Sequence, residues 1–427
     1  MAEDWTTMAP KPGDLATDKK WHVFVSYRSS HRAWVLALYD ILNGLGYRVF
    51  VDQYVLVAGS GLATSLGDAL NSSQSAILVW STDYRDSEWC TDEYNVLESK
   101  AKKKDGFRFG IAGIEDSKPD GLAEGKLWVD FSDQPEGPSG TSMLRLLYGL
   151  RGEPLPESAV KMAEAVDEQM RDGLNSVKSY RSNGNPAGLI DLAKTENMAW
   201  SSSPMLLCAA ADALIALKRV PDALEVLHRA ENSFPKALRP KQLRGLALAR
   251  DGKIEEAQFV MGKLYADGQI GPETLGIYAR TWFDRYKGEG KRVHLLKSRD
   301  LYLQAFNAFP TDFYTGINAA TKSLLAGEKD KATELAERVL AGTGEEPDPT
   351  NYWKTATIAE AQLLLGRFDG AAKTYEAAVV SAPDETGSHE STCSQAALVL
   401  DELGATDEQK ALVLRVFPVH QANADAD

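Results

Sequence analysis

The chain has 427 residues, 44% of them hydrophobic and 25% charged, which is the composition of a globular protein with two or three domains. Its formal net charge of −14 argues against a broad nucleic-acid surface, because such surfaces gather Lys and Arg. Three cysteines are too few for a disulfide framework. The six histidines do not show the spacing of metal ligands, so no metal site is predicted.

The first 19 residues are polar and contain proline, and they lack the apolar stretch of a signal peptide. A flexible N-terminal tail is therefore expected for residues 1–19. No apolar run elsewhere is long enough for a membrane span. These observations predict a cytoplasmic protein with no membrane partner.

Residues 20–152 alternate short apolar runs with segments of helical periodicity. Such alternation is typical of a parallel α/β sheet with right-handed crossovers. In the first helical segment, Trp34, Leu38, Ile41 and Leu45 form one apolar stripe. The expected strands cover residues 21–27, 47–52, 75–81, 107–114 and 127–131, and the expected helices cover 31–46, 61–73 and 87–103.

Ligands of parallel sheets bind beyond the carboxyl ends of the strands. This edge is expected to carry residues 26–28, Asp52 with the loop that follows it, and residues 81–93. Trp89 and Glu93 stand four residues apart on a predicted helix, so they share a helical face. They are therefore candidates for one ligand site.

The strand pattern stops near residue 153. Residues 153–200 are predicted to form a helical connector, residues 201–385 a series of about five helix pairs, and residues 386–427 terminal capping helices and a tail. Small residues recur within the pairs, and Ala223 and Ala257 are separated by the 34-residue period of tetratricopeptide repeats. The recurring small residues are Ala211, Gly245, Ala320 and Ala359 in the first helices, and Ala223, Ala257, Ser298, Ala332 and Ala371 in the second.

The motifs of the first half resemble the Toll/interleukin-1 receptor (TIR) family. They are "FVSYR" in the first strand, "VFVD" with the loop "QYVLVAGSG" in the second, and "STDYRDSEWCTDE" after the third. The last is similar to the S-x-x-Y-x-x-S-x-W-C-x-x-E signature of bacterial and plant TIR domains. The resemblance implies a flavodoxin-like sheet of five parallel strands, followed here by an all-α tetratricopeptide-like solenoid.

The resemblance also implies an activity, namely cleavage of NAD⁺ as a substrate to nicotinamide and ADP-ribose or a cyclic variant, without a cofactor. The family's catalytic glutamate falls on Glu93. The substrate-binding positions fall on Trp89, Tyr27, Arg28, Asp52 and Ser81.

This residue set suits the chemistry. Cleavage of the nicotinamide–ribose bond passes through an oxocarbenium-like state that a carboxylate stabilises. An aromatic side chain can stack on a base, and an Arg can hold a pyrophosphate. Structural roles stay open: Trp89 as part of the core, Glu93 as acceptor for a backbone donor, Asp52 in an Asx turn, and Ser81 in a turn.

Two functions follow as hypotheses. The first is an NAD⁺-cleaving effector of bacterial immunity and antiphage defence. It would be activated when TIR domains self-associate through the loop at residues 53–61, after the repeats bind an unknown protein or small-molecule trigger. The alternative is a non-catalytic TIR adaptor that binds partners through its repeats, since a fold does not fix an activity. Hydrolysis and cyclisation are not distinguished by the sequence.

Overall fold

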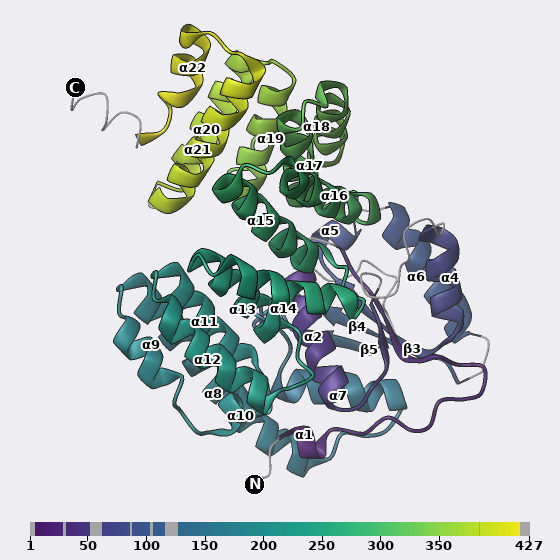
Figure 1. Cartoon of the computed structure of the whole chain (residues 1–427). Helices are drawn as coiled ribbons and strands as arrows, with labels where there is room; N and C mark the ends of the chain where they lie inside the picture. Colours follow the sequence, from purple (N-terminus) through teal and green to yellow (C-terminus); the bar gives the residue numbers. More distant parts are fainter. Residues whose placement is uncertain are drawn as a thin grey trace. The chain divides into compact units, whose positions relative to one another are not determined.

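A computed structural model gives the fold of the chain (Figure 1). The chain divides into two compact units, Met1–Gln269 and Ile270–Asp427. For residues 62–66, 83, 85 and 88–93 only the backbone is described. The described residues are 5–28, 31–51, 62–85, 88–102, 106–115, 127–383 and 385–418.

Five parallel strands in the first unit form one sheet in the order β2-β1-β3-β4-β5. This order and the parallel pairing confirm the predicted flavodoxin-like sheet. Most of the strand residues are buried, as expected for a sheet that is covered on both faces. The strands are β1 (Trp21–Ser26), β2 (Val49–Phe50), β3 (Ser73–Trp80), β4 (Arg108–Gly113) and β5 (Leu127–Asp130).

Helices cover both faces of the sheet. Buried residues of α2 and α7 join Val23, Val25 and Ile77 in one cluster, and buried residues of α4, α5 and α6 join Phe24 and Leu78 in another. The apolar stripe predicted for α2 is buried throughout, because it packs on the first of these faces. The helices are α2 (Arg32–Gly44), α4 (Leu62–Asn71), α5 (Thr82–Arg85), α6 (Glu88–Ala101) and α7 (Gly140–Arg151).

The N-terminal segment is packed, which corrects the expected flexible tail for its described part, residues 5–19. A short helix, α1 (Trp5–Met8), buries Trp5 to 1% exposure. The hydroxyl of Tyr47 donates to the Pro10 carbonyl at 2.7 Å, and that of Tyr148 donates to the Met8 carbonyl at 2.9 Å. Burying an indole stabilises by about 2–3 kcal/mol, which offsets the ordering of a few residues.

The core on the α2/α7 face continues into the helices that follow the sheet. Residues of α8, α11, α12 and α13 belong to the same buried cluster as those of α2 and α7. The compact units therefore divide after Gln269, whereas the sequence predicts a boundary at residues 152/153. These helices are α8 (Glu157–Ser182), α9 (Pro186–Leu192), α10 (Met198–Ser202), α11 (Met205–Ala216), α12 (Val220–Ser233), α13 (Arg239–Arg250) and α14 (Ile254–Ala266).

The second unit continues the helix pairs. It contains α15 (Pro272–Glu289), α16 (Arg292–Ala308), α17 (Phe313–Leu325), α18 (Lys329–Thr343), α19 (Tyr352–Leu364), α20 (Phe368–Ser381), α21 (Thr386–Leu403) and α22 (Asp407–Leu414).

In the described part of the chain, five pairs of contacting helices follow one another, from α11/α12 to α19/α20, and α21 and α22 come after them. The small residues recognised in the sequence are buried where paired helices meet. The third pair differs because its helices are longer. Its buried alanine in α15 is Ala279, at 0% exposure.

None of the described helices combines the length and the apolar character that a membrane crossing requires.

Candidate active site

Because all five strands are parallel, their carboxyl ends lie at one edge of the sheet. At this edge β1 ends at Ser26, which pairs with Leu78, and β3 ends at Trp80, which pairs with Gly113 of β4. The residues that follow these strands are therefore neighbours in space although they are far apart in the sequence.

A buried hydroxyl network joins the ends of β1 and β3. The Ser26 Oγ and Tyr84 hydroxyl oxygens lie 2.8 Å apart, and the Tyr84 backbone N–H donates to Ser81 Oγ at 3.1 Å. All three side chains are at most 2% exposed. Ser81 thus holds the turn at the start of α5, the structural role that the sequence left open for it. Its contact with a substrate stays a prediction.

Glu115 connects a third strand end to the same edge. It follows β4, and its Oε2 accepts the backbone N–H of Thr82 at 2.8 Å. Its Oε1 lies 3.4 Å from Nε2 of His31, the residue that precedes α2. Glu115 therefore ties the beginnings of α2 and α5 to the end of β4.

The predicted residues Tyr27 and Arg28 lie at this edge directly after Ser26, and both are half-buried. The Tyr27 ring packs against the core on the α2/α7 face. The Arg28 carbonyl accepts the backbone N–H of His31 at 3.0 Å. Asp52 and the loop at residues 53–61 lie outside the described residues.

The backbone of Trp89 and Glu93 belongs to α6, which begins at Glu88 shortly after the turn held by Ser81. Their side chains lie outside the described part. The next residues of α6 face the sheet: Tyr94 is 2% and Leu97 0% exposed. The Tyr94 ring lies edge-on to Phe109 of β4, with ring centres 6.1 Å apart. The buried Tyr94 and Leu97 hold α6 against the sheet, so positions 89 and 93 are carried by an anchored helix.

The structure thus brings Tyr27, Arg28 and Ser81 to one edge, together with the start of α6. Three further residues of this edge, Tyr84, His31 and Glu115, had no role in the sequence interpretation. Tyr84 is the tyrosine of the signature quoted above, so the motif could have identified it. His31 and Glu115 have no sequence signal, because only tertiary contacts connect them. Within the described residues there is no cluster of three His, Cys, Asp or Glu side chains suited to a metal ion.

Removing the hydroxyl network is expected to loosen this edge. Tyr84→Phe and Ser26→Ala should each lower the free energy of unfolding by about 1 kcal/mol, because each removes one buried hydrogen bond. In a double-mutant cycle measured by denaturant unfolding, the combined loss should be smaller than the sum, with a coupling of at least about 0.5 kcal/mol. Strictly additive losses would show that the two hydroxyls do not interact.

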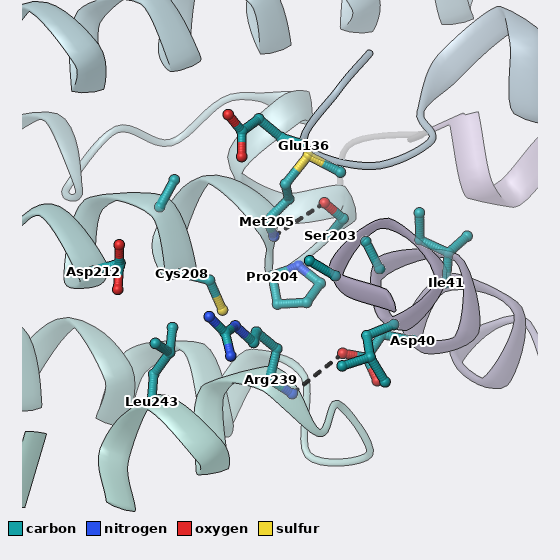
Figure 2. Close-up of a pocket in the computed structure, with 14 residues that line it drawn as sticks. Asp40, Ile41, Glu136, Ser203, Pro204, Met205, Cys208, Asp212, Arg239 and Leu243 are labelled. Atoms are coloured by element: carbon teal, nitrogen blue, oxygen red, sulfur yellow. Dashed lines mark hydrogen bonds between the residues drawn. The ribbon is translucent and has the colours of Figure 1, made fainter. Parts of the chain in front are cut away.

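A second polar contact connects the sheet helix α2 to the repeat helix α13 (Figure 2). Asp40 of α2 is 7% exposed, and its two oxygens accept the backbone N–H groups of Leu238 and Arg239 at 3.0 and 3.4 Å, at the start of α13. A carboxylate there interacts favourably with the helix dipole. Burial raises the pKa of Asp40 to about 6, although both hydrogen bonds act in the opposite direction.

The pocket beside Asp40 has a volume of ≈160 Å³ and is bounded by α2, α11 and α13 (Figure 2). It contains the thiol of Cys208, whose pKa is raised by burial. A thiol of this kind is a poor nucleophile. The contact links the sheet region to the repeats within one compact unit.

Two family models match the chain, one in the sheet-forming part and one in the part formed by helix pairs. Residues 23–147 match the family model for the TIR domain, and residues 216–326 match the model named Tetratricopeptide Repeats-Sensor.

Among curated proteins, the chain is 32% identical over 94 residues to TMV resistance protein N of Nicotiana glutinosa, covering 21% of this chain and 8% of that protein. It is 25% identical over 114 residues to the probable 2' cyclic ADP-D-ribose synthase BdTIR of Brachypodium distachyon, covering 26% of this chain and 51% of that protein. The chain thus spans about half the length of one relative and less than a tenth of the other.

Among solved structures, a thermophilic TPR protein of Thermus thermophilus aligns at 19% identity and a TM-score of 0.38, covering 45% of this chain and 98% of that one. The repeat architecture itself rests on the helix pairs described above and on the matching family model. The chain therefore has a TIR domain at its N-terminal side and sensor-type tetratricopeptide repeats at its C-terminal side.

Proposed function

We propose that the protein is an NAD⁺ nucleosidase that cleaves the nicotinamide–ribose bond through its TIR domain. The observation that carries this proposal is the position of α6. This helix carries Trp89 and Glu93 and follows β3 after the short helix α5, in a domain that matches the TIR family. Tyr27 and Arg28 follow the neighbouring strand β1 at the same edge of the sheet. The similarity to a plant protein named as a probable 2' cyclic ADP-D-ribose synthase supports the same chemistry.

In this proposal Glu93 stabilises the positive charge that develops on the ribose as nicotinamide leaves, or holds the ribose hydroxyls. Trp89 stacks on a base, and Arg28 holds the pyrophosphate, with Tyr27 and Asp52 completing the substrate contacts. Ser81, Tyr84 and Ser26 act as positioning residues, because their buried network fixes the turn at the start of α5, the short helix that precedes α6 in the chain. The product is ADP-ribose or a cyclic variant of it.

We further propose that activity depends on assembly of TIR domains, and that the repeats receive the trigger. A cytoplasmic enzyme that consumes NAD⁺ without restraint would harm its own cell, so control is expected in a bacterial defence effector. Asp40 provides a direct structural connection, because it joins a helix of the TIR domain to the start of α13. Such a contact can transmit a change in the repeats to the domain that carries Glu93.

The purified full chain, incubated with NAD⁺ across a wide range of protein concentrations, should release nicotinamide. Chromatography is expected to show a specific activity that rises with protein concentration or with a crowding agent. A charge placed in the second-strand loop, Ala58→Glu, should weaken that rise; Ala58 lies outside the described residues. A flat specific activity that Ala58→Glu leaves unchanged would refute control by this loop. Assembly without any loss of NAD⁺ would favour the adaptor function instead.

A further inference from the structure

The second unit contains a pocket of ≈260 Å³ that is separate from the TIR domain. It is lined by α15, α17 and α19, which are the first helices of three successive pairs, and by α16 and α21. These helices stand next to one another in the structure (Figure 1). Its volume is close to the lower end of the range for small-molecule sites, about 300–1,000 Å³.

Lys322 of α17 gives this pocket a buried cation, at 2% exposure. Its Nζ lies 4.0 Å from the centre of the Phe283 ring and 3.4 Å from Asn318 Oδ1. Among the described residues no carboxylate forms an ion pair with this amine. Burial lowers the pKa of Lys322 to about 8, so most of the amine is still charged at pH 7. Glu360 and Asp284 of the same pocket attract this amine from beyond ion-pair distance, but they do not offset the effect of burial on it. The phosphate of a ligand in direct contact would stabilise the buried charge further.

The other cations of the pocket already have a partner. Asp284 pairs with Lys287 at 2.7 Å and with Arg280 at 3.6 Å, all on α15. Counted together with Lys322 and Glu360, the charged side chains that line the pocket carry about one net positive charge. In a chain with 61 acidic and 47 basic residues, such a positive pocket is a local exception.

Two aromatic side chains in the same pocket are open to solvent. Tyr314 is 46% and Trp353 is 52% exposed. Both side chains line the cavity, so their exposed rings are available to a ligand bound in it. A flat ring can stack there, and each stacked base contributes about 1–3 kcal/mol.

Glu360 supplies a buried acceptor at the same site. The Thr321 hydroxyl and the Gln395 amide both donate to its Oε1, and Oε2 accepts no hydrogen bond among the described residues. The amino group of a heterocycle could donate to that oxygen.

We infer that this pocket binds a nucleotide-like small molecule, with its phosphate on Lys322, its ring on Trp353 or Tyr314, and an amino group of the base at Glu360. This ligand class fits the buried amine of Lys322, the open aromatic surface and the buried acceptor together. The inference extends the proposed function by giving a chemical class to the trigger of the repeats. It rests on the second unit alone and holds whether or not the TIR domain cleaves NAD⁺.

Isothermal titration of the full chain with AMP tests the inference without any turnover of NAD⁺. AMP should bind measurably, and at least about 10-fold more tightly than adenosine or inorganic phosphate, because each of these lacks one half of the recognised chemistry. Lys322→Met and Trp353→Ala should each weaken AMP binding by about 10-fold or more. The matched controls Lys329→Met and Phe259→Ala, both exposed positions outside the pocket, should bind like the wild type.

A melting curve separates a binding role from a structural one. Burial makes the charged form of Lys322 less favourable in the folded protein, as its lowered pKa indicates. Lys322→Met should therefore leave the melting temperature unchanged or raise it while AMP binding falls. Undiminished AMP binding by Lys322→Met would overturn the inference. The inference would also be overturned if an acidic peptide bound more tightly than AMP and Lys322→Met abolished the binding of that peptide.

Discussion

Glu93→Gln is expected to reduce NAD⁺ cleavage by at least about 100-fold, the usual effect of removing an electrostatic stabiliser of a transition state. The amide keeps the size of the side chain and removes the negative charge that would face the developing oxocarbenium ion. Glu93→Ala should have a similar effect. The fold should be retained, because the helix that carries residue 93 is anchored by Tyr94 and Leu97. Release of nicotinamide, followed by chromatography at a protein concentration where the wild type is active, measures the loss.

Glu98→Gln is the matched control, because it is the same substitution on the same helix. Glu98 forms an exposed ion pair with Lys102 at 3.2 Å, which contributes less than about 1 kcal/mol to stability. This variant should keep at least half of the wild-type activity. Equal NAD⁺ consumption by Glu93→Gln and the wild type would remove Glu93 from the mechanism.

The second large effect is expected at Asp40. Asp40→Ala leaves the backbone N–H groups of Leu238 and Arg239 without their acceptor at a largely buried site. Each unsatisfied buried group costs about 1–3 kcal/mol, so the loss of both acceptor contacts should lower the unfolding free energy of the first unit by at least about 2 kcal/mol. Asp212→Ala is the control, because Asp212 lines the same pocket and is half-exposed, with Arg181 at 3.8 Å. In a denaturation experiment, the unfolding free energy of Asp212→Ala should lie within about 1 kcal/mol of that of the wild type.

The pH dependence of the same site gives an independent measurement. The folded-state pKa of Asp40 is about 6, above the usual value of 3.8, so the folded protein holds this proton more tightly than the unfolded chain. As the pH rises from 4 to 6, the unfolded chain therefore releases the proton first, and stability falls. The difference of about two pKa units corresponds to about 3 kcal/mol.

Asp40→Asn cannot ionise and isolates this contribution. The unfolding free energy of the wild type minus that of Asp40→Asn should decrease by up to about 3 kcal/mol as the pH rises from 4 to 6, and then stay constant. The charged groups nearest to Asp40 are Arg239 and Lys241, which favour its ionised form and moderate the effect. A difference that increases with pH in this range would mean that Asp40 is stabilised in its charged form.

Local patterns in the sequence were sufficient for the elements and their order. Trp34, Leu38, Ile41 and Leu45 recur at helical spacing because α2 packs one face on the sheet, and all four are buried. The apolar runs that became β1, β3 and β4 are continuous because both faces of the sheet are covered. The small residues of the helix pairs were recognisable because close helix crossings need them at a fixed spacing. The signature after β3 likewise placed Trp89 and Glu93 beyond the end of a strand.

The tertiary structure alone decided which of these elements share a core and which polar groups meet. Asp40 and Leu238 are 198 positions apart, and Ser26 and Tyr84 are 58 apart, so no local periodicity records either contact. The same holds for Trp5, whose burial depends on helices far along the chain, and for Lys322, whose pocket is formed by three helix pairs and α21. The division after Gln269 follows from this packing, because α8, α11, α12 and α13 extend the core of the sheet. The periodicity of apolar residues shows which side chains of one helix or strand face the core and which face solvent. The contacts above depend instead on how separate helices and strands pack against one another.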